Sequence, residues 1–231
     1  MNHLDIDTSE PVTLIGGGEA TREDLEIARG IGPACVAADG GAQLALDQGI
    51  PLEAVIGDMD SISGAARARI PAERFHPVAE QDSTDFDKAL RHIRAPLIVA
   101  VGFTGGQIDH SLAALNTLVR RCERMVILLG QQDVVFLCPR VIDLPMPAGT
   151  RVSLFPMGPV RGCSNGLKWP IDGIEFAPGG RSGTSNQSLG DVHLEMSSAE
   201  MLCILPRPFM HLAAAQLLSV PAHARWPARA E

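Results

Sequence analysis

The chain has 231 residues, of which 45% are hydrophobic and 20% are charged, and its formal net charge is -8. This length and composition are typical of a folded globular protein with one large domain or two modest ones. The acidic balance and the lack of any lysine- or arginine-rich block in the sequence argue against nonspecific binding to nucleic acid or to an anionic membrane surface.

The first half of the chain alternates strand and helix signals. An apolar run over 12–15 meets Gly16-Gly17-Gly18, which predicts a strand followed by a glycine turn. The pattern continues with a helix over 23–29, a strand over 34–38, a helix over 43–48, a strand over 54–56, a helix over 64–70, a strand over 75–78, a helix over 85–93, a strand over 97–101, a helix over 109–122 and a strand over 125–129. Because helical crossovers join parallel strands, we predict an α/β domain with a mostly parallel Rossmann-like sheet over residues 1–135.

From about residue 131 the signals change to short β-like stretches broken by Gly, Pro and Asn. These stretches cover 134–138, 141–144, 151–155, 191–196 and 201–205. Alternating apolar and polar residues without intervening helices are typical of antiparallel sheets, so we predict an all-β antiparallel sandwich domain over residues 136–208. The tail, residues 209–231, is rich in Ala, Pro and Arg and is expected to contain one short helix.

The cysteines and the amino terminus indicate the compartment. Five cysteines are scattered without a C-x-x-C pair, a pattern that favours reduced thiols over disulfides or a zinc site. The first residues lack the basic and apolar regions of a signal peptide, and no apolar run is long enough to span a membrane. We therefore expect a cytoplasmic protein.

Acidic residues follow successive predicted strands. Since the carboxyl ends of parallel strands share one edge of a sheet, these side chains are expected to converge around a metal and a phosphorylated ligand. They are Asp39, Asp58, Asp60, Asp82, Asp85 and Asp109. In extended backbone, Asp58 and Asp60 point to the same side and offer the oxygen ligands that Mg²⁺ prefers; the alternative for this pair is a polar turn with solvated acids.

Other segments carry weaker signals. Lys88, one turn after Asp85, is one of only two lysines, and a compact ammonium suits phosphate; an ordinary capped helix start explains part of this segment equally well. The glycine-rich segments match neither a G-x-G-x-x-G fingerprint nor a Walker A loop, so a dinucleotide site is not supported. Trp169 either offers an indole face to a cationic or aromatic ring or packs in the core.

Six motifs in this order closely resemble the thiamine pyrophosphokinase family, over roughly residues 12 to 206. They are Ala38-Asp39-Gly40-Gly41-Ala42, Gly57-Asp58-Met59-Asp60-Ser61, Gln81-Asp82-x-Thr84-Asp85-x-x-Lys88, Gly105-Gly106-x-x-Asp109-His110, Gly166-Leu167-Lys168-Trp169 and Thr184-Ser185-Asn186. The resemblance implies an α/β catalytic domain, a carboxyl-terminal β-sandwich, and a homodimer with active sites between subunits. It also implies transfer of a pyrophosphoryl group from ATP to the hydroxyl of thiamine, giving thiamine diphosphate and AMP.

The resemblance further implies roles for individual residues. Metal-binding and phosphate-binding roles fall on Asp58, Asp60 and Asp85, with Mg²⁺ as the metal. The nucleotide and phosphates would be lined by Asp39, Gln81, Thr84, Lys88 and Asp109, with Asp109 also placed among the catalytic residues. Thiamine would stack on Trp169 near Ser185 and Asn186.

One departure from the family pattern lies at Gln107, where many members carry arginine. A missing cation near the phosphates weakens ATP affinity or slows transfer unless Arg181 or Lys88 compensates. The general base is left open between Asp109 and Asp85. Two alternatives stay open at this point: a related pyrophosphokinase acting on another heterocyclic alcohol such as a pterin, and a nucleotide-binding protein without turnover.

Overall fold

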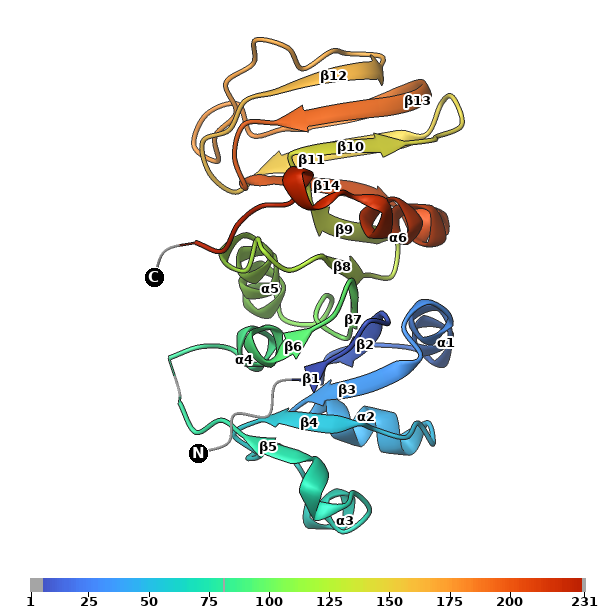
Figure 1. Ribbon diagram of the computed structural model, residues 1–231, viewed down its shortest axis with the longest axis vertical. Helices are drawn as coiled ribbons and strands as arrows, with labels where there is room; N and C mark the ends of the chain where they lie inside the picture. Colours follow the sequence, from blue (N-terminus) through green and yellow to red (C-terminus); the bar gives the residue numbers. More distant parts are fainter. Residues whose placement is uncertain (1–5, 81, 230–231) are drawn as a thin grey trace. The chain divides into compact units, whose positions relative to one another are not determined.

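The computed structural model describes residues 6–80 and 82–229 (Figure 1). The chain divides into two compact units. The first takes in the described residues up to Thr117 together with Leu128–Gln131, and the second takes in Leu118–Ile127 and the described residues from Gln132 onward. The predicted domain limits at residues 135 and 208 stay predictions.

Five strands form the parallel part of the first unit. In the order β7 (Ile98–Val101), β2 (Val12–Ile15), β3 (Ala34–Ala38), β4 (Ala54–Gly57) and β5 (Phe75–Pro77), each strand pairs in parallel with its neighbours. β1 (Ile6–Asp7) and β6 (Ile93–Arg94) form a separate parallel pair. β2, β4 and β7 are buried at every residue, which explains their continuous apolar sequences: strands covered on both faces have no polar side to present.

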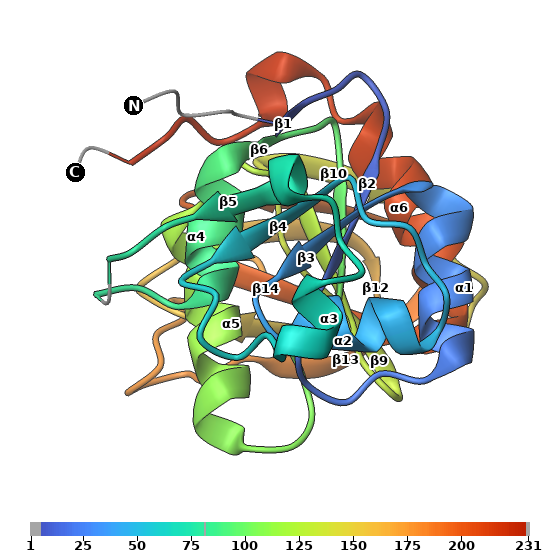
Figure 2. The same ribbon diagram turned by 90° about the horizontal axis from the view of Figure 1, so that it is seen from below.

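Helices follow these strands. They are α1 (Arg22–Ile31), α2 (Gly41–Asp47), α3 (Gly64–Arg67), the short 3₁₀ helix η1 (Ala72–Arg74) and α4 (Asp85–His92). Figure 2 shows α4 on one side of β3 and β4 and α1 with α2 on the other. The start of α1 is fixed by a capping box between Thr21 and Asp24, and the start of α4 by Thr84, whose hydroxyl accepts a hydrogen bond from the Asp87 N–H at 3.2 Å.

The chain passes between the units at three points. The first, after Thr117, lies in α5 (Ile108–Arg120), the second, after Ile127, lies in β8 (Val126–Leu129), and the third follows Gln131. Both elements were predicted from their apolar residues, with ends within two residues of those observed.

The second unit is built from antiparallel strands. They are β9 (Asp133–Leu137), β10 (Val141–Leu144), β11 (Arg151–Pro156), β12 (Gly162–Leu167), β13 (Thr184–Met196) and β14 (Met201–Pro206). β13 is long enough to pair with β11 through its first residues and with β10 and β12 through its later ones. The chain continues into η2 (Arg207–Phe209), α6 (Met210–Ser219) and η3 (Ala222–Ala224), so the short helix expected in the tail is confirmed.

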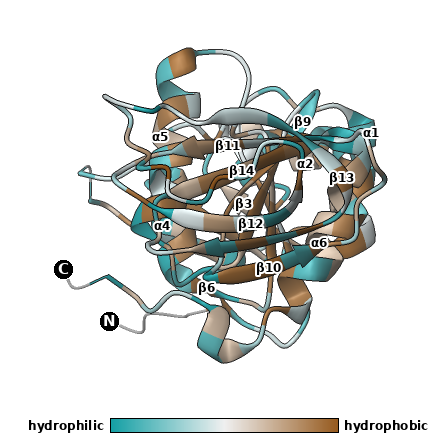
Figure 3. Cartoon of the chain, turned by 90° about the horizontal axis from the view of Figure 1, so that it is seen from above, coloured by the Kyte–Doolittle hydropathy of each residue, from teal (hydrophilic) through white to brown (hydrophobic). Residues whose placement is uncertain are grey.

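An α/β part followed by a β part is therefore confirmed, but the sequence analysis missed β12 and the first half of β13. Both segments are polar: β12 reads GCSNGL and β13 begins TSNQSLG. Figure 3 shows pale and teal residues along these strands, whereas β10 is mainly brown. Their backbone pairing, rather than apolar alternation, defines them as strands.

No helix in the described chain is both long and apolar enough to cross a membrane. The five cysteines are all free thiols, as predicted. Four of them are buried, and Cys163 is exposed.

Candidate functional site

Asp39 is a buried carboxylate directly after β3. Its backbone has a left-handed φ of 38°, and it packs so closely against Gly57 that a Cβ added there would lie 2.7 Å from the Asp39 Cβ. Asp39 Oδ2 accepts a hydrogen bond from the Ser61 N–H at 3.3 Å, while Oδ1 is buried and has no hydrogen-bond partner among the described residues. Burial raises the pKa of Asp39, and the nearby charges of Asp85 and Asp58 raise it further.

Asp58 and Asp60 follow β4, the neighbouring parallel strand. The backbone between them is not extended as predicted, because Met59 has a left-handed φ of 68°. The turn lets the Asp60 N–H donate to Asp58 Oδ1 at 3.3 Å, and Arg67 Nη2 donates to the Met59 carbonyl at 2.9 Å. The predicted alternative of a polar turn is thus correct for the backbone, and the turn itself brings the two carboxylates together.

Asp39, Asp58 and Asp60 form a group in which one ligand oxygen from each residue lies within 4.8 Å of the others. Parallel pairing of β3 with β4 explains this convergence, since both strands end at the same edge. Three hard oxygen donors, one with an unpaired buried oxygen, match the preference of a divalent cation such as Mg²⁺.

Lys88 ties α4 to this group. Lys88 is 2% exposed, and its ammonium donates to Asp58 Oδ2 at 3.2 Å and to Asp85 Oδ1 at 3.0 Å. Burial acts to lower the pKa of Lys88, but the hydrogen bonds and charges of Asp85 and Asp58 outweigh it, so this pKa is raised. The pKa of Asp58 is lowered by the hydrogen bond from the Asp60 backbone and by Lys88. The ammonium and the Asp58 carboxylate therefore both carry their charges at neutral pH.

The remaining residues predicted for this region are placed as follows. Asp85 contacts Lys88 but is not among the three carboxylates within ligand distance of one another. Thr84 caps α4 immediately before Asp85. Asp109 is exposed near the start of α5, where Oδ1 accepts from the His110 N–H at 2.9 Å. Gln81 lies outside the described residues.

The glycine turn after β2 makes a close backbone contact with Gly102, which follows β7. A Cβ at Gly16 would lie 2.5 Å from the Gly102 carbonyl oxygen, and the Gly18 N–H donates to that oxygen at 2.9 Å. The ends of β2 and β7 are thereby held together by hydrogen bonding between their own loops.

In the second unit, Trp169 lies beside a pocket of about 380 Å³. Trp169 is 54% exposed, and the Lys168 ammonium lies 4.8 Å from its ring centroid. The contact shows that the indole attracts a cation, and a cationic aromatic ring would have to displace this ammonium or stack on the opposite face. The pocket is lined by Trp169, Pro170, Ile174, Arg181, Gly183, Thr184 and Ser185.

Asn186 supports this pocket from within the unit. Its side chain is 3% exposed, accepts from the Trp169 N–H at 3.1 Å and donates to the Trp169 carbonyl at 2.6 Å. Ser185 and Thr184 line the pocket, and the Thr184 hydroxyl oxygen is buried without a hydrogen-bond partner in the described chain. Arg181, which the sequence analysis names as one of two cations that compensate for Gln107, lines the same pocket.

Comparisons with known proteins match both units. The model of the thiamin pyrophosphokinase catalytic domain matches residues 32–129, and the model of the thiamin pyrophosphokinase vitamin B1 binding domain matches residues 140–200. The first range contains Asp39, Asp58, Asp60 and Lys88, and the second contains Trp169 and Ser185.

Curated relatives include two plant proteins. Thiamine pyrophosphokinase 1 of Oryza sativa subsp. japonica is 29% identical in an alignment of length 185, and the match covers 65% of this chain and 70% of that protein. Thiamine pyrophosphokinase 1 of Arabidopsis thaliana is 28% identical in an alignment of length 153, and the match covers 58% of this chain and 57% of that protein. The matched region thus leaves a substantial part of each plant protein uncovered.

Solved structures show the same fold at low identity. The thiamin pyrophosphokinase of Geobacillus thermodenitrificans has a TM-score of 0.68 and 23% identity, covering 85% of this chain and 96% of that one. The yeast thiamin pyrophosphokinase has a TM-score of 0.70 and 15% identity, covering 95% of this chain and 92% of that one. Because the two domain models together match more than half of the chain, the protein belongs to the thiamine pyrophosphokinase family.

Proposed function

We infer that the protein is a thiamine diphosphokinase, which transfers the pyrophosphoryl group of ATP to the hydroxyl of thiamine and releases AMP. The observation that carries this function is the joint presence of the carboxylate group with Lys88 in the catalytic-domain match and the Trp169 pocket in the vitamin B1 binding match. Nothing in the comparisons favours a pterin substrate or a binding protein without turnover.

We propose Mg²⁺ as the metal of the carboxylate group. Asp58, Asp60 and Asp85 are the predicted ligands, and the grouping of Asp39 with Asp58 and Asp60 adds Asp39 to the set. The unpaired buried oxygen of Asp39 supports this addition, since a buried carboxylate oxygen is costly without a partner. When bound, Mg²⁺ would neutralise charge on the phosphate oxygens during transfer.

For the nucleotide we propose the segment around the start of α4. Thr84 and Lys88 lie in the described part of this segment. Asp39, which follows β3, is proposed with them, as are Gln81 and Asp109, from the family resemblance. In-line displacement at the β-phosphorus depends on positioning and charge neutralisation more than on a strong base. Lys88 supplies a fixed positive charge, held within hydrogen-bond distance of Asp58 and Asp85. The general base remains open between Asp109 and Asp85.

For thiamine we propose the pocket beside Trp169. An exposed indole face stacks on an aromatic ring and attracts positive charge, and thiamine offers both. Ser185 is proposed to contact the substrate from the pocket wall, and Asn186 to fix the Trp169 backbone. Compensation for Gln107 is proposed for Arg181 or Lys88.

The remaining expectations are also proposals. The parallel pairing of β7, β2, β3, β4 and β5 supports a mostly parallel Rossmann-like class for the first unit. The antiparallel pairing of β9 to β14 supports a sandwich for the second. A homodimer with active sites between subunits, a cytoplasmic location and no nucleic-acid or membrane partner are proposed on the family resemblance and the composition.

The direct test is incubation of the purified protein with Mg·ATP and thiamine, followed by chromatography of nucleotides and thiamine species. Thiamine diphosphate appearing in step with AMP supports the proposal. Unchanged thiamine in the presence of folded protein overturns it, and a parallel incubation with a hydroxymethyl pterin identifies the alternative substrate class. A reaction in excess chelator tests the metal. We expect turnover to be lost in the chelator and to recover when Mg²⁺ is added in excess.

A further inference from the structure

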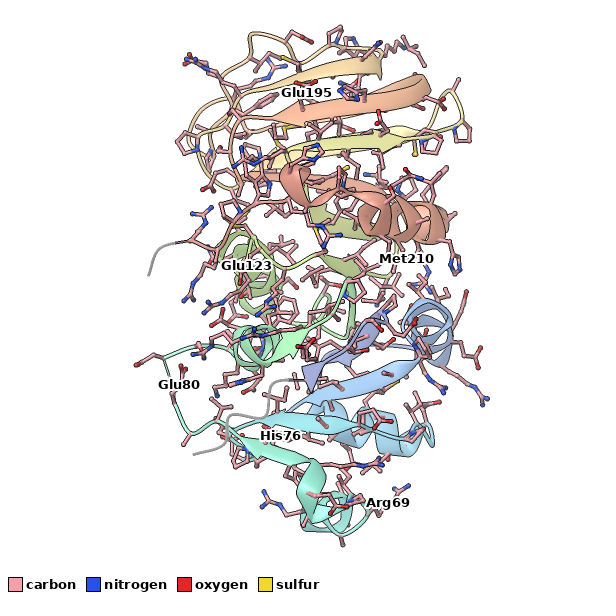
Figure 4. All side chains as sticks on the ribbon, in the orientation of Figure 1. Arg69, His76, Glu80, Glu123, Glu195 and Met210 are labelled. Atoms are coloured by element: carbon pink, nitrogen blue, oxygen red, sulfur yellow. The ribbon has the colours of Figure 1, made fainter. Side chains whose placement is uncertain are left out.

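Arg91 lies on α4, six residues after Asp85, and joins the helix to the segment that precedes it. Its Nη2 donates to Glu80 Oε2 at 2.8 Å and to Ser83 Oγ at 2.7 Å. Its Nε lies 3.5 Å from Asp87 Oδ2. Figure 4 labels Glu80 on the chain that leads into α4.

The acceptors of Arg91 are also bonded to one another. Ser83 Oγ donates to Glu80 Oε1 at 2.6 Å, so Glu80, Ser83 and Arg91 form a closed ring of three hydrogen bonds. Glu80 accepts from both Ser83 and Arg91, and these two hydrogen bonds lower its pKa to about 2. The ring connects the segment before α4 to the second turn of that helix.

The ring adjoins the phosphate-binding region in sequence. Thr84, which caps α4, follows Ser83 directly, and Asp85 comes next with its bond to Lys88. Asp87 contacts both the cap and the ring: its N–H donates to Thr84, and its carboxylate lies 3.5 Å from Arg91 Nε. The start of α4 is therefore held by Thr84 and by Arg91, and Asp85 follows Thr84 directly.

We propose that Arg91 is a positioning residue for the nucleotide site: through Glu80 and Ser83 it sets the placement of Thr84 and Asp85 at the start of α4. This inference rests on the proposed function. Arg91 itself donates to Glu80 and Ser83 rather than to Asp39, Asp58 or Asp60.

Relative magnitudes separate this role from simple stabilisation. The Arg91 side chain is 30% exposed and that of Glu80 35%, and ion pairs with such access to water contribute little to stability. A displacement of about 1 Å in a positioning group, in contrast, lowers turnover by up to about 100-fold. The effect of Arg91 is therefore expected in nucleotide binding and turnover, with little change in the thermal midpoint.

The ring also explains why arginine is needed here. Arg91 uses two separate nitrogens: Nη2 donates to Glu80 and Ser83, while Nε faces the Asp87 carboxylate at 3.5 Å. The single nitrogen of a lysine ammonium does not reproduce that arrangement. Arg91→Lys keeps the positive charge but loses the planar guanidinium that bonds Glu80 and Ser83, so it is the informative substitution. Arg22→Lys is the matched control, because Arg22 pairs with Glu26 at 2.8 Å on an exposed face of α1.

The experiment compares the wild-type protein, Arg91→Lys, Glu80→Gln and Arg22→Lys. For each, we measure KM values for Mg·ATP and thiamine, kcat and the thermal midpoint, together with the calorimetric affinity, in the presence of Mn²⁺, for AMPCPP. This analogue carries a methylene group between the α- and β-phosphorus atoms, where pyrophosphoryl transfer would break the chain. Arg91→Lys is expected to weaken AMPCPP binding and raise the KM for Mg·ATP by about tenfold, with the KM for thiamine changed less than about twofold. Glu80→Gln is expected to act in the same direction, and the double variant to be no worse than Arg91→Lys alone.

Two results would overturn the inference: unchanged AMPCPP affinity in Arg91→Lys, or equal increases in both KM values. Failure of the proposed function is separate from both. It would appear as a wild-type protein that binds AMPCPP but does not convert ATP and thiamine into thiamine diphosphate, and the AMPCPP comparison would still decide the role of Arg91.

Discussion

The side-chain amide of Asn186 holds the backbone of Trp169 at both its N–H and its carbonyl, at 3.1 and 2.6 Å. Asn186 belongs to β13, whereas Trp169 lies two residues beyond the end of β12. The strand thus fixes the position of a loop residue whose ring remains 54% exposed. Asn186 therefore fixes the backbone of Trp169 without covering its indole.

Replacement of Asn186 by Leu tests this arrangement. We expect the KM for thiamine to rise by about tenfold, because the indole loses its backbone anchor, and stability to fall by about 1–3 kcal/mol, because buried backbone groups lose their partners. Steady-state kinetics and thermal unfolding measure the two effects. Asn165→Ala, at an exposed asparagine of β12, is the control, and a variant of Asn186 with normal thiamine kinetics would contradict the prediction.

Trp169→Ala tests the stacking surface itself. Loss of the indole face removes stacking and cation–π attraction, so the KM for thiamine should rise by about 10-fold to 100-fold, while the KM for Mg·ATP stays within about twofold. Phe155→Ala, which removes another exposed ring of the same unit, should leave both constants unchanged. An equal effect of Trp169→Ala on both KM values would exclude the stacking role.

Asp60→Asn tests the proposed metal group. Asp60 is exposed, so the fold should persist, but loss of one charged ligand should reduce turnover by at least about 100-fold and weaken Mn²⁺ binding measured by paramagnetic resonance. The matched control is Asp47→Asn on α2, where the carboxylate accepts a hydrogen bond from Gln43 at 2.7 Å. Near-normal turnover in Asp60→Asn would remove Asp60 from the metal site.

Gly57→Ala tests the packing behind Asp39. The φ of 155° and the 2.7 Å approach to the Asp39 Cβ both oppose a side chain at this position, so we expect a loss of about 1–3 kcal/mol in stability together with weaker Mn²⁺ binding. Gly64→Ala provides the contrast, since nothing lies within 4 Å of a Cβ there and Gly64 is helical. Gly64→Ala should be neutral or slightly stabilising in chemical denaturation.

His193 predicts a pH dependence of stability. Hydrogen bonds to Asp143 at 2.6 Å and to Glu195 at 3.1 Å raise the pKa of His193 above its usual value of 6.5, while partial burial opposes them. Asp143 on β10 and Glu195 and Asp191 on β13 are the charged groups around it. A raised pKa means that the stabilisation is complete below the unfolded-state pKa and is lost as the pH rises through the folded-state value.

His193→Gln should therefore be less stable than the wild type by about 0.5 kcal/mol near pH 6 and equal to it near pH 9, the small size reflecting partial exposure. Urea unfolding at several pH values measures this difference. His211→Gln on α6 serves as the control for loss of an exposed imidazole. A stability difference between the wild type and His193→Gln that grows as the pH rises would contradict a raised pKa of His193.

Apolar periodicity made most of the fold predictable. The strands over 34–38 and 141–144 were predicted with the observed ends, and the helix at Asp85 with its observed start. β12 and the first half of β13 carried no such signal, because their polar side chains line or support a pocket and their pairing depends on long-range backbone contacts.

The site was predictable in composition but less so in geometry. Strand ends in a parallel sheet indicated that Asp39 and Asp58 converge, yet the left-handed Met59 that brings Asp60 beside them depends on the folded turn. The bonds of Lys88 to two carboxylates likewise depend on how α4 lies relative to β4, which no local pattern specifies. The ring around Arg91 had no sequence signal at all.

Lys88 and Lys168 are the only lysines in the chain, and each lies in one of the two proposed binding regions. Lys88 is 2% exposed and bonded to two carboxylates, whereas Lys168 is exposed beside the indole of Trp169. Amine-selective reagents therefore distinguish the two regions without any engineered label. Of the two lysines, acylation under native conditions modifies Lys168 before Lys88, and mass mapping of the peptide that contains Lys168, with and without added thiamine, reports on that pocket.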